Sequence, residues 1–508
     1  MRLEILAAVG AYAAVLLAVG LRFPRKVRGL DSFFLASRRV GAARIAFSLC
    51  ASWIGAASLL VSTDEAYAAG ISAYWVIGLP AVVTLAGLIF LVRPIRALGS
   101  ETISDRMAAC YGRAARPLTT ILIVWYMMAL AGSQLVAAGE FVRGVLGAPY
   151  LVSLAAATAV LLLYSWAGGF AAVLRTHTLQ FFLLLAGVAA LVASLGRHGG
   201  WREVGPAAAA LGKTGYFGFF SGGARNVLIA LSFVLAWTIS PIAWQRMKAA
   251  RSEGAARRGL AGAAVALAVF YAGIVLAGLL FLPLFTGGAP GGPLIAAYIN
   301  GKASGALGGL LFVAVLAAIF STADAAVNTG AFSLTADYLS YAKRRSEPER
   351  SGSLEPGGAL DAPIAPQKAA ANAGKGADNE DNVNKISWLH RTAPRLATLV
   401  IGGGAFLVAA RFQNILLTLG LASKIMAEGL FVPGMAALLI RRRAPLAGLL
   451  SLAAGGGYAL LGFLAEAGLR LVRMPPWPHS LLPGVGLSAA GFLLGLGLER
   501  LGQTRLAR

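Results

Sequence analysis

Polar side chains interrupt one long apolar segment, and they are the residues of this chain best suited to chemistry. Ser321, Thr322 and Asp324 fall within the stretch from Gly305 to Tyr338, which is long and apolar enough to cross a membrane. A hydroxyl in such a helix can bond back to a helix carbonyl, but a carboxylate has no local solution of this kind. Carboxylates inside a membrane face a cavity or another polar group and mark ion or substrate pathways. The segment therefore predicts a transport pathway.

The composition of the whole chain agrees with a membrane location for this segment. Of the 508 residues, 58% are hydrophobic and 13% are charged. Apolar windows of spanning length recur from end to end, and they predict an all-α integral membrane fold with about thirteen transmembrane helices in a lipid bilayer. The windows lie near residues 3–22, 42–62, 72–93, 118–142, 150–165, 177–196, 225–242, 259–285, 304–338, 394–411, 415–440, 446–467 and 480–499.

The positive charges are distributed asymmetrically between the two sides that these windows define. With the N-terminus outside, 32 of the 44 Lys and Arg residues fall in cytoplasmic connections and 10 in outer ones. The positive-inside rule therefore predicts a multi-pass protein of the cell membrane with its C-terminus in the cytoplasm. The net charge of +23 reports this topology and contact with anionic lipids. Because the basic residues are scattered over many short loops, nucleic acid is not an expected partner.

One segment, residues 344–390, differs from the rest. It is rich in Glu, Pro, Gly, Ala, Asp and Asn and has few large apolar residues, so it cannot bury enough surface to fold. We expect a disordered cytoplasmic linker, acting as a passive tether or as a regulatory docking segment.

A second polar stretch runs from Ser48 to Ser58 and is dense in small residues and hydroxyls. Small residues allow close helix packing. They also allow a membrane helix to break and free carbonyl oxygens, which can replace the hydration shell of a sodium ion. The sequence leaves both interpretations open. A hard cation prefers such oxygens, together with hydroxyls like those of Ser321 and Thr322.

The combined motifs resemble the sodium:solute symporter family. The resemblance rests on four stretches: Ala51 to Ser58; Tyr164-Ser165-Trp166-Ala167-Gly168-Gly169-Phe170-Ala171-Ala172-Val173 with Thr176 and Gln180; Gln245-Arg246 with Ala249-Ala250; and Ala317 to Asp324 running on to Asp337-Tyr338. With the span pattern, these cover most of the chain up to about residue 440.

The resemblance implies a LeuT-like core of two inverted five-helix repeats with a site at mid-membrane, where broken helices meet. The repeats would occupy residues 39–200, and 201–343 with 391–444, while 1–38 and 445–508 would add extra helices. The family's main sodium site uses carbonyls of the first core helix and a carbonyl and hydroxyls of the eighth. Carried onto this sequence, the Na+ ligands fall on Ala51, Ile54, Ala318, Ser321 and Thr322.

One departure from the family pattern is informative. Where members usually have Thr-Asp after the Gly-Gly motif, this chain has Thr176-His177, and a carboxylate stands instead at Asp324. If His177 and Asp324 face each other, they form a coupled polar unit beside the sodium exit route. If they face different directions, no such unit exists. A second sodium site built in the family's usual way is not expected.

Another charged pair falls in the eleventh window, where Lys424 and Glu428 are one helical turn apart. They either neutralise each other or let Lys424 recognise a substrate carboxylate. Ser52 and Trp53, at the expected helix break, are the other candidate substrate contacts. The indole would either narrow the cavity or stack on a flat substrate.

These features predict a secondary transporter, not an enzyme, that imports a small polar or anionic solute together with sodium. A proton-coupled or sodium-independent transporter using His177 and Asp324 is the alternative within transport. A membrane sensor that kept the fold but lost the flux is the alternative outside it.

Overall fold

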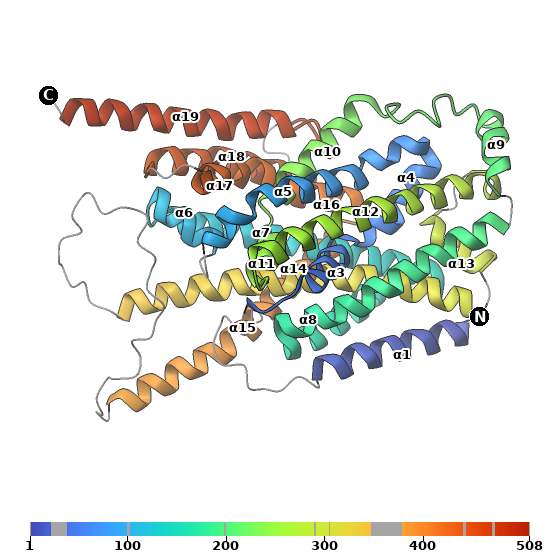
Figure 1. The fold of residues 1–508 in the computed structure, drawn as a ribbon, viewed down its shortest axis with the longest axis horizontal. Helices are drawn as coiled ribbons and strands as arrows, with labels where there is room; N and C mark the ends of the chain where they lie inside the picture. The colour runs from blue at the N-terminus through green and yellow to red at the C-terminus, as the bar shows by residue number, and fades with distance from the viewer. Residues whose placement is uncertain are drawn as a thin grey trace.

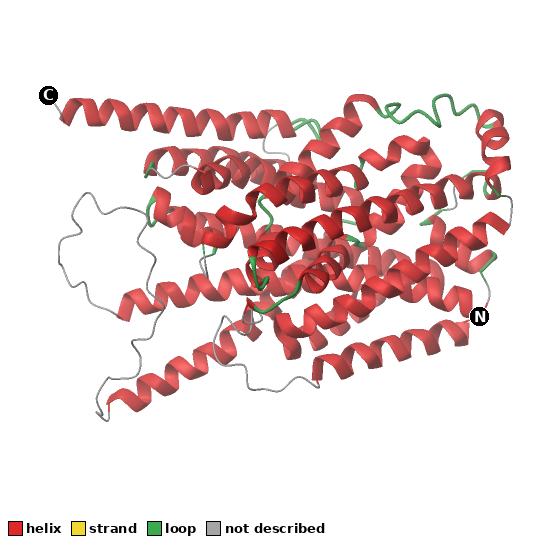
Figure 2. Ribbon diagram, viewed as in Figure 1, coloured by secondary structure: helices red, strands yellow, loops and turns green. Residues whose placement is uncertain are grey.

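The computed structural model is built from helices (Figure 2). It describes residues 2–21, 38–98, 102–197, 200–288, 291–303, 305–346, 378–439, 443–469 and 473–506. In these ranges the only strand-like feature is an isolated β-bridge between Val40 and Ala250. The helices, in chain order, are α1 (Arg2–Leu21), α3 (Ala42–Trp53), η2 (Ala57–Val61), α4 (Ser62–Ala69), η3 (Gly70–Trp75), α5 (Gly78–Ala97), α6 (Ile103–Tyr111), α7 (Ala115–Leu146), α8 (Tyr150–Arg197), η4 (Trp201–Glu203), α9 (Val204–Ala210), α10 (Gly223–Thr238), α11 (Pro241–Ala249), α12 (Glu253–Phe281), η5 (Leu282–Leu284), α13 (Leu294–Gly301), α14 (Gly305–Ser346), α15 (Asp378–Arg411), α16 (Ile415–Lys424), η6 (Ile425–Leu430), α17 (Phe431–Leu439), α18 (Pro445–Glu466) and α19 (Leu481–Leu506).

Many of these helices can span a membrane. Within the described ranges, nine are long and apolar enough, or ten when the bent pair α10 and α11 counts as one span. Two shorter apolar segments, Leu3–Leu16 and Tyr150–Trp166, add to these. Each predicted window falls on a helix or on adjoining helices. The all-α membrane fold is confirmed, and the count of thirteen spans stays a prediction.

The helices pack side by side in one bundle (Figure 1). On one flank α1 contacts α8 and α14, while α18 and α19 pack against each other on another. The apolar window of α14 is 83% buried inside the protein, whereas that of α19 is 28% buried. Because a helix enclosed by protein must find partners for its polar groups, the polar residues of α14 have to meet neighbouring helices.

Several of the apolar helices are interrupted. α3 and η2 are separated at Ile54 and Gly55, and α10 and α11 bend by 43° at their junction. Two segments, η2 and η6, are π-helical turns next to α-helices. π-helical turns are frequent at functional sites, and helices broken at corresponding positions of two repeats often form a binding site. The space between the broken helices α3 and α10 is therefore the candidate site.

Most of the linker expected at 344–390 lies outside the described residues. α14 continues to Ser346 and α15 begins at Asp378, so both described ends of this segment are helical. The side chains at 167–172, within one of the family-like motifs, and that of Tyr338 also lie outside the described part.

Candidate ion and substrate site

Gly55 lies between α3 and η2, the two halves of an interrupted helix. Ile54 has φ −82° and ψ 75°, which is not helical, so α3 ends inside the bundle. Its last carbonyls, including that of Ala51, are thereby released from helical hydrogen bonding. On the far side of the break the Ala56 amide donates to Gln134 Oε1 at 2.8 Å. The break is therefore held by a side chain from α7.

One face of α14 lies against this break. Ala318, Ser321 and Thr322 share that face by their three- and four-residue spacing. A Cβ placed on Gly55 would lie 2.9 Å from Thr322 Oγ1, so the hydroxyl packs directly on the interrupted backbone. The Ser321 hydroxyl donates to the Ala318 carbonyl at 3.0 Å. Thr322 Oγ1 is buried and has no hydrogen-bond partner among the described residues.

These groups form a donor set of the kind that a sodium ion prefers. They offer only uncharged oxygens, from carbonyls and hydroxyls, and hard cations bind oxygen ligands. A buried polar atom without a partner loses the favourable free energy of its hydration. A cation bound to Thr322 Oγ1 would offset that loss. A cluster of His, Cys, Asp or Glu able to hold a metal ion was not found in the described ranges. Because its oxygens are all uncharged, the donor set fits a monovalent ion such as sodium.

A second interrupted helix lies opposite the first. α10 ends at Thr238, and α11 starts at Pro241 after a bend of 43°. Trp237, Ser240 and Ile242, from either side of this bend, line the same cavity as Ser52, Trp53, Gly55 and Thr322. The breaks of the two helices thus meet at one central space.

The central cavity is small and uncharged. Its volume is about 30 Å³, which is room for about two water molecules and far less than the usual volume of a ligand pocket. Tyr126 and Gln134 of α7 add a hydroxyl and an amide to its wall. Among the described residues that line it there is no charged side chain. An organic solute can enter only when the cavity widens.

A series of contacting aromatic rings, two tilted pairs and one stacked pair, extends from this cavity toward the loop before α19. The ring centroids of Trp53 and Trp237 are 5.3 Å apart, and Trp237 stacks on Phe233 at 4.9 Å. Phe233 in turn contacts Trp477 at 5.9 Å, and the Trp477 indole N–H donates to Ser232 Oγ at 3.2 Å. We name Trp53, Trp237, Phe233 and Trp477 the aromatic stack. Trp53 and Trp237 of the aromatic stack line the cavity.

His177 and Asp324 are in contact in the centre of the bundle. His177 Nε2 lies 2.9 Å from Asp324 Oδ1, and both side chains are fully buried. His177 Nδ1 is 3.1 Å from Ser48 Oγ, and Arg246 Nε donates to that same oxygen at 3.0 Å. The network joins α3, α8, α11 and α14.

The network forms a bridge between two ionisable side chains. Arginine can only donate, so Ser48 Oγ accepts a hydrogen bond from Arg246 and keeps a lone pair and its own hydrogen available to His177 Nδ1. The imidazole connects Ser48 and Asp324 through its two ring nitrogens. Arg246 and Asp324 therefore lie at opposite ends of one buried hydrogen-bonded bridge.

The comparisons with known proteins agree with this geometry. The model of the "Sodium:solute symporter family" matches residues 33–353. The chain belongs to the sodium:solute symporter family. It is 28% identical over 204 residues to the sodium/pantothenate symporter of Escherichia coli (strain K12), covering 38% of this chain and 41% of that protein. It is also 27% identical over 161 residues to the sodium/iodide cotransporter of Homo sapiens, and this match covers 32% of this chain and 25% of that protein. These matches span less than half of either relative.

Solved structures show the same fold. A Na+-coupled sialic acid symporter in a substrate-bound, outward-open state superposes with a TM-score of 0.71 at 16% identity, over 97% of both chains. Mhp1, a nucleobase-cation-symport-1 family transporter in a closed conformation, gives 0.51 at 16% identity, over 92% of this chain and 95% of that one. This family member therefore has the LeuT-like fold that the sequence predicted.

Lys424 and Glu428 do not line the cavity of this symporter-family chain. Lys424 Nζ lies 3.7 Å from Glu428 Oε2, and both side chains are buried. Lys424 contacts Gly462 of α18 and its Nζ is 5.0 Å from the ring centre of Tyr458, while Glu428 contacts Gly484 of α19. The pair therefore faces the C-terminal helices and not the space between the broken helices.

A third ionic group lies at the end of α14 away from the aromatic stack. Asp337 accepts hydrogen bonds from Thr120 at 2.5 Å and from Thr102 at 3.2 Å. Arg116 lies 2.6 Å from Asp105 and 3.7 Å from Asp337. This group ties α6 and α7 to α14.

Some residues of the site were not anticipated from the sequence. Gln134, Tyr126, Trp237 and Ser240 line the cavity, and Arg246 with Ser48 completes the buried network. Gln134 did carry a signal, because it is a lone amide inside an apolar span. Nothing in its spacing indicated that it would meet Ala56, which is far away in the sequence.

Proposed function

We propose that this chain is a sodium-coupled symporter that imports a small polar solute by alternating access. The observation that carries the proposal is the buried Thr322 hydroxyl at Gly55, for which the described part of the chain offers no hydrogen-bond partner. In this proposal Ala51, Ile54 and Ala318 provide carbonyl oxygens to the ion, and Ser321 and Thr322 provide hydroxyls. Membership of the sodium:solute symporter family supports sodium as the coupling ion.

The lining of the cavity favours a neutral solute over an anionic one. The described lining residues bear no charge, and an uncompensated ion would be costly there. Trp53 and Trp237 offer flat aromatic faces, and Ser52, Gln134 and Ser240 offer hydrogen bonds. These groups suit a neutral, partly planar molecule with several polar atoms.

The positions of the proposed sodium ligands suggest how sodium binding is coupled to solute transport. An ion bound between the end of α3 and α14 would hold the two inverted repeats together next to the cavity. In the proposed division, these are residues 39–200, and 201–343 with 391–444. Residues 1–38 and 445–508 provide extra helices, and the 344–390 segment tethers the last part of the second repeat.

The proposed orientation has the N-terminus outside and the C-terminus in the cytoplasm of the cell membrane. It places the ionic group of Asp337 and Arg116 on the inner side and the aromatic stack on the outer side. The excess of Lys and Arg in the connections at the inner end supports this orientation.

The test is sodium binding to purified protein, measured with radioactive sodium and by sodium-dependent Trp fluorescence. Thr322→Ala should raise the half-saturating sodium concentration by about tenfold, because one oxygen ligand is lost. Thr398→Ala is the matched control, since that buried hydroxyl donates to the Pro394 carbonyl at 2.9 Å in another helix. Equal sodium dependence in the two variants would remove the ion from this site.

Transport itself is tested in proteoliposomes with neutral and anionic solutes. Uptake of a neutral polar solute should require an inward sodium gradient. Proton coupling is the second candidate, because His177 and Asp324 are 2.9 Å apart in a buried network. Uptake driven by a pH gradient without sodium would favour it, and tight solute binding without any flux would favour a sensor.

A further inference from the structure

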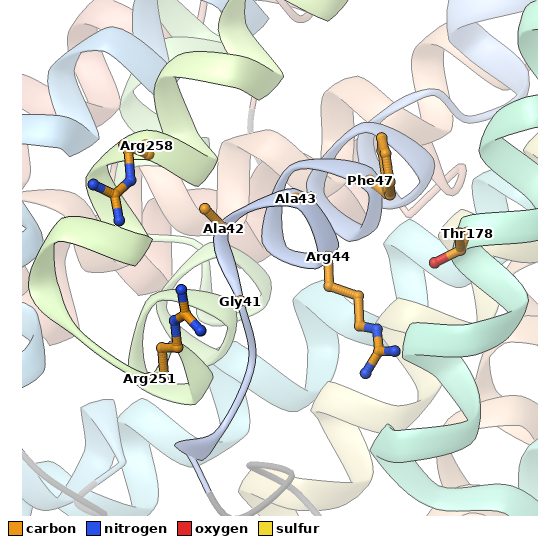
Figure 3. A pocket seen from close by; sticks show the side chains of 8 residues that line it. All are labelled: Gly41, Ala42, Ala43, Arg44, Phe47, Thr178, Arg251 and Arg258. Atoms are coloured by element: carbon orange, nitrogen blue, oxygen red, sulfur yellow. The ribbon is translucent and has the colours of Figure 1, made fainter.

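An open hollow lies at the start of α3, away from the central cavity. Its volume is about 510 Å³, and it is lined by Gly41, Ala42, Ala43, Arg44, Phe47, Thr178, Arg251 and Arg258. Figure 3 shows Arg251 and Arg258 on one side of the backbone at Gly41, and Arg44 on the other, extending toward α8. The hollow is of the size of a ligand site, and its lining comes from α3, α8 and α12 and from the turn before α12.

The frame of this hollow is held rigidly. The Val40 amide donates to the Ala249 carbonyl at 3.1 Å, and the Arg251 amide donates to the Val40 carbonyl at 2.9 Å. α12 packs tightly on α3, because a Cβ on Gly259 would lie 2.6 Å from Ile45 Cγ2. The arginines therefore project from a preformed backbone.

The positive charges of the hollow are not neutralised within the described residues. Arg44, Arg251 and Arg258 are exposed, and none forms a described salt bridge. The nearby carboxylate of Glu253 lies 2.8 Å from Arg257, which is not among the residues that line the hollow. Guanidinium groups on several sides of one hollow are suited to the oxygens of a phosphate.

An apolar track leads away from the charged end. Thr178, Phe182 and Leu185 share one face of α8 by their helical spacing. Phe182 is 52% exposed and Leu185 is 45% exposed. The ring centroid of Phe182 lies 5.4 Å from that of Phe47, which lines the hollow. The charged hollow and the apolar track are therefore continuous.

We propose that the hollow binds the headgroup of an anionic phospholipid, with an acyl chain lying along Phe182 and Leu185. Arg44, Arg251 and Arg258 would contact the phosphate, and Thr178, whose hydroxyl donates to the Leu174 carbonyl at 3.1 Å, would line the site. The apolar track favours a lipid over free phosphate, because an acyl chain can cover the exposed side chains of Phe182 and Leu185 and an inorganic anion cannot. Basic pockets between membrane helices at the cytoplasmic side bind such headgroups. The lipid would bridge α3, α8 and α12.

The experiment uses the full chain in detergent, titrated with phosphatidylglycerol or with phosphatidylcholine of the same acyl chains. Native mass spectrometry counts retained lipids, and thermal unfolding gives an apparent affinity. Phosphatidylglycerol should bind more tightly than phosphatidylcholine. Its affinity should fall by about 100-fold in the triple variant Arg44→Gln, Arg251→Gln, Arg258→Gln. A triple variant of exposed arginines outside the hollow, Arg113→Gln, Arg197→Gln, Arg443→Gln, should bind like the wild type.

The track is tested separately with Phe182→Ser, matched by Phe90→Ser at another lipid-exposed position, 81% exposed. Phe182→Ser should weaken phosphatidylglycerol binding by several fold, and Phe90→Ser should not. Equal binding by the two arginine triples would overturn the site. Competition by inorganic phosphate at millimolar concentration, with no effect of Phe182→Ser, would overturn the lipid and leave a free-anion site.

Discussion

The molecule contains two buried acid–base pairs that differ in what they join. His177 and Asp324 lie on α8 and α14, 147 positions apart, and belong to a network that also holds Ser48 and Arg246. Lys424 and Glu428 are one turn apart on a single interrupted helix, at 3.7 Å, and face α18 and α19. The first pair ties helices of the two proposed repeats, whereas the second is local to one helix.

The difference between the pairs lies in how each charge is balanced. In the network, Ser48 and His177 lie between Arg246 and Asp324 and connect them through hydrogen bonds. In the helical pair the opposite charges are immediate neighbours, and the Tyr458 ring gives Lys424 a further contact. Replacing the carboxylate of each pair by its amide should therefore change the free energy of unfolding by different amounts.

The largest effect is expected from Asp324→Asn. It removes the acidic member of the buried network that also holds Arg246 and should lower the free energy of unfolding by about 3–5 kcal/mol. The measurement is thermal or denaturant unfolding of the purified protein. Adding Arg246→Gln should recover most of the loss, whereas adding His177→Ala should recover little. Full rescue by His177→Ala would mean that His177, not Arg246, carries the balancing charge.

A smaller effect is expected from Glu428→Gln. Lys424 keeps its contact with Tyr458, so the free energy of unfolding should fall by about 2 kcal/mol. The double variant Lys424→Met, Glu428→Gln should return to near wild-type stability. Solute affinity and sodium dependence should be unchanged in the double variant, as measured by binding to purified protein. A lasting loss of solute affinity would restore Lys424 as a substrate contact.

Much of the fold could be predicted from the sequence because lipid imposes it. Apolar windows had to be helices, since no other open structure satisfies its backbone in a bilayer. The Lys424–Glu428 contact follows from helical spacing alone. The direction in which that pair faces does not, because it depends on Gly462 and Gly484 of other helices.

The candidate site was predictable only in part. The stretch from Ser48 to Ser58 left close packing and helix breakage open, and the structure shows both at Gly55: the helix stops, and α7 and α14 approach its backbone. The contact between His177 and Asp324 was one of two open alternatives, and it is present. Arg246 and Gln134 join the site through tertiary packing, for which a single sequence has no periodic signal.

The smallest effect is expected from Ser48→Ala, which removes the bridge but no charge. The free energy of unfolding should fall by about 1–2 kcal/mol, since Arg246 and His177 each lose one hydrogen bond. Ser52→Ala, one turn along α3, is the control, because that hydroxyl donates only to the Leu49 carbonyl of its own helix at 3.1 Å. Equal stability of the two variants in denaturant titrations would show that Ser48 does not connect the network.

The aromatic stack has a thermal consequence. Separating Trp53 from Trp237 and Phe233 from Trp477 would expose ring surface to water, and hydration of apolar surface raises the heat capacity. The hydrophobic contribution to these ring contacts declines at low temperature. Any opening of the cavity that separates these rings would therefore depend on temperature, with a strongly curved profile.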